Sequence, residues 1–282
     1  MVQSSESQAH PGGGGRLLNT FLNRPVEDHS SAWSDLWDAG ESNLWDRGKP
    51  SPALIDLVEQ QTPLLSPLTP TGRRKRALVP GCGRGYDVVM LALHGFDACG
   101  LEISETAVQE ARRYAADVMA RPPADYFGPQ YRPPSSPGSV TFVKGDFLNP
   151  AWSVEEGADG SNAFDLVYDY TFLCALHPRK RPDWAAGMSR VIKSQGLLIC
   201  LEFPMYKDPR LAGPPWGLKG VHWNLLVKGG NGEITGEVAD DGKEKNDCDS
   251  ETGNFQRLLY IKPPRSYEVA RGTDMISVYI RK

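Results

Sequence analysis

A glycine-rich loop followed at a set distance by an acid is the pattern in this chain with the clearest chemical use. Residues 79–87 read Val-Pro-Gly-Cys-Gly-Arg-Gly-Tyr-Asp and connect a short apolar run to a helical pattern. Glycines such as Gly81 and Gly83 allow positive φ angles and let a ligand approach the backbone closely. Glu102 ends the next apolar run, 21 residues after Gly81, where a carboxylate can accept hydrogen bonds from both hydroxyls of an unphosphorylated ribose. The pattern predicts a cofactor that carries a ribose; the alternative is a tight turn beside a surface glutamate.

Tyr86 distinguishes between two cofactors that fit this layout. The dinucleotide fingerprint G-x-G-x-x-G would place glycine or alanine at this position. A tyrosine would crowd both the contact between helix and strand and the approach of a pyrophosphate. S-adenosylmethionine carries no phosphate and is compatible with the G-x-G-x-G spacing present here. We therefore expect S-adenosylmethionine, and an NAD oxidoreductase is the less favoured alternative.

Two acids that follow later apolar runs are further candidates. Asp146 lies in Lys-Gly-Asp-Phe at residues 144–147, where its carboxylate can accept from an adenine amino group while Phe147 covers the ring; a simple turn acid is the alternative. Asp169 and Tyr170 follow the apolar run 164–168. Asp169 can hold the amino group of a methionine moiety, and Tyr170 can border the substrate. We take Asp169 and Tyr170 as the candidate catalytic residues.

Methyl transfer from a sulfonium makes modest demands on a protein. It is an in-line displacement with a neutral leaving group, so no acid is required, and an anionic acceptor requires no base. Such a site works by holding the reactants about 3–3.5 Å apart and by removing water from the anion. His177 is accordingly interpreted as a residue at the start of a helix, and Cys82 as a small buried side chain rather than a nucleophile.

Three of the seven tryptophans, Trp33, Trp37 and Trp45, fall within thirteen residues. On a helix, Trp33 and Trp37 are four positions apart and share one face. One interpretation is a hydrophobic clamp that holds the N-terminal segment against the core. The other is an aromatic lid over the cofactor, because indole faces attract a cation such as a sulfonium.

The elements that must position these residues alternate along the chain. Apolar runs predict strands at 77–80, 97–101, 140–143, 164–168 and 196–203, and helical patterns lie at 86–94, 104–119 and 184–192. Residues 255–261 and 275–280 alternate as strands and are expected to pair antiparallel. This order predicts an α/β fold: a doubly wound, Rossmann-like sheet of seven strands, mostly parallel with an antiparallel last strand, and helices on both faces.

With these motifs in place, the chain resembles class I S-adenosylmethionine-dependent methyltransferases, and within them the thiol, halide and thiopurine methyltransferase family. The likeness runs from about Trp33 to Pro215 and is dense in four places: residues 33–37 with 43–48, 79–87 with 100–104, 164–170, and 181–184 leading to 213–215. The resemblance implies S-adenosylmethionine as cofactor, with Trp33, Trp37 and Trp45 around it, and it adds Ile103, beside Glu102, to the cofactor-binding residues. Beyond Pro215 the likeness fades.

Composition limits the class of protein and its domains. The 282 residues are 40% hydrophobic and 23% charged, with a net charge of −4, and no apolar run is long enough to span a membrane. Residues 1–30 are polar and glycine-rich, which predicts a flexible tail before a single methyltransferase domain at 31–282. Residues 228–254 carry a net charge of −5, from eight acids and three lysines, and are expected to form a mobile insertion.

Charge and cysteine content exclude several partners. A protein that binds phosphate backbones is normally basic, so nucleic acid is not expected. The five cysteines contain no C-x-x-C pair, which argues against a metal and, without a secretory signal, favours reduced thiols and a cytoplasmic location. We expect methyl transfer to a small thiol, halide or pseudohalide. An O- or N-methyltransferase of a small secondary metabolite, or a non-catalytic cofactor-binding regulator, is the alternative, and the oligomeric state is left open.

Overall fold

A seven-stranded mixed sheet forms the centre of the computed structural model, which describes residues 13–61, 63–149, 151–152, 163–245 and 251–282. The strand order is β3-β2-β1-β4-β5-β7-β6. The strands are β1 (Arg76–Pro80), β2 (Asp97–Glu102), β3 (Val140–Lys144), β4 (Phe164–Tyr170), β5 (Ile192–Glu202), β6 (Phe255–Ile261) and β7 (Met275–Arg281). β7 pairs antiparallel with both β5 and β6, and the pairs from β3 to β5 are parallel. The predicted doubly wound, mostly parallel sheet is confirmed.

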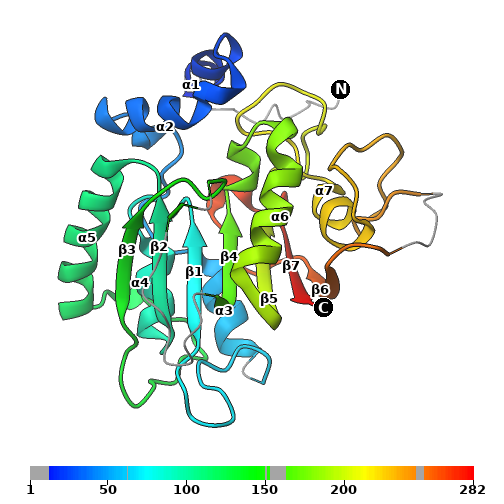
Figure 1. Ribbon diagram of the computed structural model, residues 1–282. Coiled ribbons are helices and arrows are strands. Elements are labelled where there is room, and N and C mark those ends of the chain that lie inside the picture. The colour runs from blue at the N-terminus through cyan, green and yellow to red at the C-terminus, as the bar shows by residue number, and fades with distance from the viewer. Residues whose placement is uncertain (1–12, 62, 150, 153–162, 246–250) are drawn as a thin grey trace, which may run out of the picture.

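Helices cover both faces of this sheet (Figure 1). They are α1 (Gly13–Leu22), α2 (His29–Asp38), α3 (Pro52–Gln60), α4 (Tyr86–Leu93), α5 (Glu105–Ala120), α6 (Arg181–Val191) and α7 (Val221–Trp223), which continues as a π-helix over Asn224–Lys228. Ser104 caps α5, because its Oγ accepts from the Ala107 N–H at 3.2 Å.

The alternation of side chains along each strand divides the core into two clusters. On one face Ala77 and Val79 of β1 pack with residues of α3, α4 and α5. On the other face Leu78 packs with Trp184 of α6 and with the helices that follow β5. Successive side chains of a strand point to opposite faces, so one apolar strand supplies both clusters.

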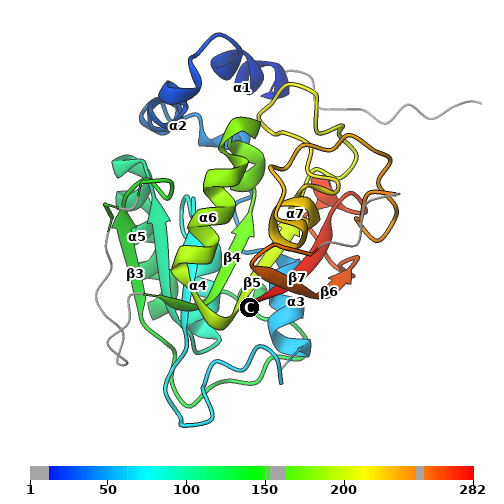
Figure 2. The same ribbon diagram turned by 45° about the vertical axis from the view of Figure 1, so that its right-hand side comes forward.

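The prediction of a flexible tail over residues 1–30 is wrong for residues 13–30. This part forms α1, a short 3₁₀ turn and the start of α2. Leu17 and Phe21 are only 6% and 3% exposed, because their spacing of four residues places both on the side of α1 that faces α2. Residues 1–12 lie outside the described residues. In Figures 1 and 2, α1 and α2 lie above the ends toward which β1, β2 and β4 point.

The acidic segment 228–254 was expected to be a mobile insertion. Its described part instead contacts the helices near it, as two interactions show. The Lys243 ammonium lies 4.4 Å from the centre of the Trp223 ring, and Arg181 Nη1 donates to the Gly232 carbonyl at 2.9 Å. Residues 246–250 of this segment lie outside the described residues.

None of the helices that the structure describes has the length and apolar composition needed to cross a lipid bilayer.

Candidate functional site

A cavity of about 480 Å³ lies between the carboxyl ends of the central strands and the roof formed by α1 and α2. Its wall includes all the residues predicted to bind the cofactor except Asp169: Trp33, Trp37, Trp45, Gly81, Gly83, Glu102, Ile103, Asp146 and Phe147. Parallel strands bring their following loops to one edge of a sheet, which explains how residues so far apart in the chain meet. Of the predicted site residues, Asp169 and Tyr170 do not line the cavity.

The glycine loop after β1 has no room for a side chain at Gly81, and its backbone angles favour glycine. Gly81 and Gly83 have φ angles of +60° and +52°, a region that favours glycine. A Cβ atom at Gly81 would lie 2.5 Å from Cδ2 of Phe172, and one at Gly83 would lie 3.4 Å from Cζ2 of Trp37. Any side chain at Gly81 would therefore displace the ring that forms part of the cavity wall.

Glu102 links this loop to the end of β2. Its Oε2 accepts from the Gly83 N–H at 3.0 Å, and its Oε1 accepts from the N–H groups of Ile103 at 2.8 Å and Ser104 at 3.2 Å. Burial raises the pKa of the Glu102 carboxyl, and these backbone hydrogen bonds act in the opposite direction. Two carboxylate oxygens have about four acceptor positions, so Glu102 retains acceptor capacity toward the cavity.

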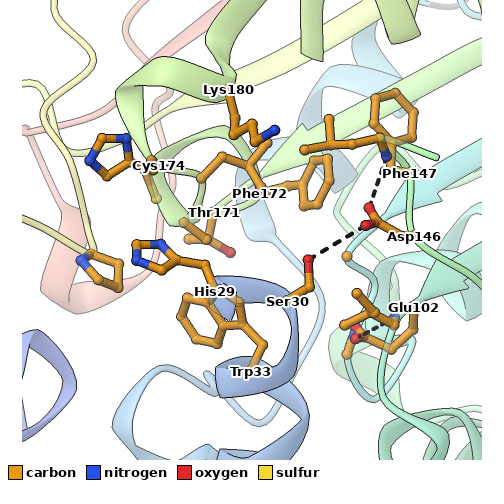
Figure 3. A pocket seen from close by; sticks show the side chains of 18 of the residues that line it. His29, Ser30, Trp33, Glu102, Asp146, Phe147, Thr171, Phe172, Cys174 and Lys180 are labelled. Carbon is orange, nitrogen blue, oxygen red and sulfur yellow. Dashed lines mark hydrogen bonds between the residues drawn. The ribbon is translucent and has the colours of Figure 1, made fainter. Parts of the chain in front are cut away.

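Asp146 connects the loop after β3 to the roof. Its Oδ1 accepts from the Leu148 N–H at 2.9 Å, and the Ser30 hydroxyl of α2 donates to Oδ2 at 3.5 Å; Figure 3 shows both side chains at the cavity. Phe147 is buried and packs edge-on against Phe172, with ring centres 5.4 Å apart. A carboxylate acceptor and an aromatic ring thus line the same part of the cavity.

The three tryptophans pack against one another and line the cavity. Trp45 packs edge-on against Trp33 at 5.2 Å and against Trp37 at 5.6 Å, while all three line the cavity. Trp33 and Trp45 also pack against the small cluster that holds α1 to α2. The Arg84 guanidinium lies 5.4 Å from the Trp37 ring centre. The rings therefore hold the roof together and form its inner surface.

Asp169 and Tyr170 end β4 behind the cavity wall. Asp169 is 3% exposed, its Oδ2 accepts from Trp184 Nε1 at 2.8 Å, and its Oδ1 accepts from the Leu173 N–H at 3.2 Å. Burial raises the pKa of its carboxyl. The Tyr170 ring stacks on Tyr267, with ring centres 5.3 Å apart. In this geometry Asp169 fixes the turn after β4. Its hydrogen bonds to Trp184 and Leu173 do not direct either carboxylate oxygen toward the cavity.

Thr171 and Phe172 line the cavity in their place (Figure 3). Thr171 has a φ angle of +58°, which is a strained conformation for a β-branched residue. Its hydroxyl donates to the Tyr170 carbonyl at 2.6 Å. The positive φ angle of Thr171 produces a sharp turn at the carboxyl end of β4. Backbone strain of this kind commonly accompanies binding sites.

Several lining residues were missed from the sequence: Leu17, Val26, His29 and Ser30 of the roof, Arg47 after Trp45, Cys174 after β4, and Phe203, Pro214 and Pro215 after β5. The spacing of Leu17 and Phe21 is the signal that would have identified the roof. His177, interpreted as a helix start, also lines the cavity, and its ring contacts that of His29 edge-on at 5.7 Å. Burial lowers the pKa of both imidazoles.

Among the described residues, no group of three or more His, Cys, Asp or Glu side chains is arranged to hold a metal ion.

Comparison with known proteins gives consistent results. The sequence model of the thiopurine S-methyltransferase family matches residues 28–248. A probable thiol methyltransferase 2 of Arabidopsis thaliana is 39% identical over 190 residues, covering 67% of this chain and 68% of that protein. A thiocyanate methyltransferase 1 of the same plant is 35% identical over 197 residues, 70% of each chain. Among solved structures, a magnesium protoporphyrin IX methyltransferase of Synechocystis has a TM-score of 0.52 at 16% identity, covering 90% of this chain and 98% of that chain, which is a likeness of fold.

Proposed function

The chain belongs to the thiopurine S-methyltransferase family, and from this premise we propose that it transfers the methyl group of S-adenosylmethionine to a small nucleophile that is already an anion, a thiolate or a halide or pseudohalide ion. The transfer is an in-line displacement. Two observations bear on this proposal: the residues that can hold the cofactor, and the hydrogen bonds that engage Asp169, the candidate catalytic acid after β4.

The residues of the cavity fit S-adenosylmethionine. Glu102 has acceptor capacity for the ribose hydroxyls, and the bare backbone of Gly81 and Gly83 allows close approach of the methionine part. Asp146 and Phe147 suit the adenine, and the three tryptophan rings suit a cation. When bound, S-adenosylmethionine supplies an electrophilic methyl group and a neutral leaving group. We assign Ile103 to the same part of the site as Glu102.

The engagement of Asp169 by other groups is the observation that carries the proposal. Asp169 was expected to hold the amino group of the methionine moiety and is a candidate catalytic residue, and its oxygens accept from Trp184 and Leu173. We therefore propose Asp169 as a positioning residue, which fixes the turn that carries Thr171 and Phe172. An acceptor that is already an anion needs no base, so this arrangement favours thiolate, halide or pseudohalide.

The remaining work of the site is orientation and exclusion of water. The α1–α2 roof and the aromatic wall can surround the reactants with apolar surface, which strips water from a small anion and raises its nucleophilicity. Holding the anion in line with the methyl group supplies the other part of the rate enhancement. Tyr170 is assigned to the border of the acceptor region, one residue behind the wall.

The pH dependence of kcat/KM tests this proposal. For two thiols of different acidity, we expect the rate to rise with pH and to level off near the pKa of each thiol, about 8.5–10 for simple thiols. With iodide, the profile should be flat over the same range. Identical profiles for both thiols that disappear in an Asp169→Asn or His177→Gln variant would contradict the proposal and indicate base catalysis by the protein. Binding of the cofactor without turnover of any acceptor would favour a regulator instead.

A further inference from the structure

Arg47 is a cation of the cavity wall without an assigned partner. It lies in the loop between Trp45 and α3 and lines the cavity. Its Nε atom is buried and has no hydrogen-bond partner among the described residues. No Asp or Glu in the described ranges lies within 4 Å of its guanidinium nitrogens; the acid next to it, Asp46, instead pairs with Arg84 and accepts from the Tyr86 hydroxyl. A buried donor without a partner is costly, so an anion in the cavity would complement Arg47.

The loop that carries Arg47 is held on both sides. Asp46 is bound by Arg84 and by Tyr86, whose hydroxyl lies 3.1 Å from Oδ1. On the other side, the Tyr267 hydroxyl donates to the Lys49 carbonyl at 2.9 Å. Since Tyr267 also stacks on Tyr170, one tyrosine connects the Arg47 loop to the end of β4. The backbone that carries Arg47 is therefore fixed relative to β4.

The Tyr170 hydroxyl is a second buried polar group in this region, and it lies next to Arg47. It makes no hydrogen bond of standard geometry within the described part of the chain. Burial raises the pKa of this phenol, and the charge of Arg47 and a side-chain interaction with its guanidinium act in the opposite direction. Burial likewise raises the pKa of the Cys174 thiol, with Arg47 again acting against it. Both groups thus stay neutral near pH 7 and leave the positive charge of Arg47 uncompensated.

The position of Arg47 separates it from the residues suited to the nucleoside. Its charge acts on Tyr170, Cys174 and Tyr267, which lie at and after β4 and near the C-terminus. Glu102 and Asp146 lie at the ends of β2 and β3, on the other side of β1 in the strand order. In an in-line displacement the acceptor approaches the methyl carbon from the side opposite the sulfur that leaves. The β4 side of the cavity, away from the residues suited to the nucleoside, is where we place the acceptor.

We propose that the guanidinium of Arg47 is the anion-recognition group of the acceptor site, selecting iodide, thiocyanate or thiolate over neutral nucleophiles, with Tyr170 as the residue that positions it. The proposal rests on the function proposed above, and it assigns to Arg47 the selectivity of the site for anionic acceptors. A planar guanidinium with several N–H donors suits a small polarizable anion, and its charge strengthens each hydrogen bond that it donates.

Arg47→Gln in the full-length chain tests the proposal by anion binding and by kinetics. Sodium thiocyanate is titrated calorimetrically into protein saturated with S-adenosylhomocysteine, and KM and kcat are measured for iodide. We expect about a tenfold or larger rise in the thiocyanate Kd and in the iodide KM, with kcat changed less than about threefold. Arg47→Lys should restore part of the affinity. Lys49→Gln is the matched control, because Lys49 is an exposed cation of the same loop and only its carbonyl contacts Tyr267.

Tyr170→Phe separates positioning from folding, because the variant keeps the ring that stacks on Tyr267. We expect its iodide KM to rise by about threefold to tenfold and its kcat to change by a smaller factor than its KM. It also keeps the proposal testable if Arg47→Gln does not fold.

Two results would overturn the proposal. One is an unchanged thiocyanate Kd in Arg47→Gln. The other is a loss of affinity for S-adenosylhomocysteine by the same factor, which would assign Arg47 to the cofactor carboxylate. If the wild-type chain methylates no anion, the proposed function fails, and the calorimetric comparison still decides the role of Arg47.

Discussion

Glu102 shows at the scale of one residue how the site depends on its own scaffold. Its carboxylate accepts from three backbone N–H groups, those of Gly83, Ile103 and Ser104. The same carboxylate faces the cavity. The group that is proposed to bind the ribose therefore also holds the glycine loop against the end of β2, and its removal affects binding and loop conformation together.

Glu102→Ala should weaken binding of S-adenosylhomocysteine at least tenfold, about 1.4 kcal/mol or more. Its melting temperature should also fall, because three N–H groups lose their acceptor. Isothermal calorimetry and thermal unfolding measure the two effects. Glu105→Gln is the control, since Glu105 is exposed at the start of α5 and should change neither quantity. If Glu102→Ala bound S-adenosylhomocysteine with unchanged affinity, the proposal that Glu102 binds the ribose hydroxyls would be wrong.

At the scale of elements, the roof is separate from the two main cores. Leu17 and Phe21 of α1 cluster with Ala32 and Leu36 of α2, and none of them belongs to the clusters on the two faces of the sheet. The roof contacts the sheet layer through specific pairs such as Ser30 with Asp146. Loss of the roof should therefore affect the cavity more than it affects the sheet.

Deletion of residues 1–24 removes α1 and tests this separation. We expect affinity for S-adenosylhomocysteine to fall several-fold, on the order of 1 kcal/mol, because Leu17 no longer covers the cavity. The melting temperature should fall by only a few degrees, since the two sheet clusters remain intact. A parallel deletion of residues 1–12 isolates the contribution of α1. Global unfolding of the longer deletion would instead show that the roof clamps the core.

At the scale of the whole molecule, buried polar contacts join layers that are distant in the chain. Asp87, in the first turn of α4, accepts through Oδ1 from the Ser51 N–H at 2.8 Å, and Ser51 caps α3. Burial raises the pKa of Asp87 from 3.8 to about 7. This contact ties the glycine loop to the helix that follows the Arg47 loop, and it makes stability depend on pH.

The sign of that dependence follows from proton binding. Between about pH 4 and pH 7 the folded chain keeps the Asp87 proton and the unfolded chain has lost it, so the free energy of unfolding contributed by this group falls as pH rises through the window. Asp87→Asn keeps an acceptor for Ser51 and removes the charge. Relative to this variant, the wild type should lose roughly 2–4 kcal/mol between pH 4 and pH 8. Urea unfolding of both proteins at several pH values measures it. Parallel pH dependences would show that Asp87 has an ordinary pKa in the fold.

The sequence by itself determined the features that depend on neighbouring residues. Period-two and period-3.6 patterns identified all seven strands and the helices α4, α5 and α6. They missed α1, α3 and α7, and β5 begins four residues before the predicted strand, at Ile192. The glycine loop and Glu102 were identified because a positive φ angle and a strand end are local properties.

Only the tertiary structure decided which groups face the cavity. Ser30 reaches Asp146 across 116 positions of the chain, and Tyr267 reaches Lys49 across 218. The direction of the Asp169 carboxylate depends on Trp184 of α6, and the isolation of Arg47 depends on Asp46 having other partners. In each case several groups that are distant in the chain compete for one partner after folding. The pattern of residues along the chain does not indicate which of these groups lies nearest.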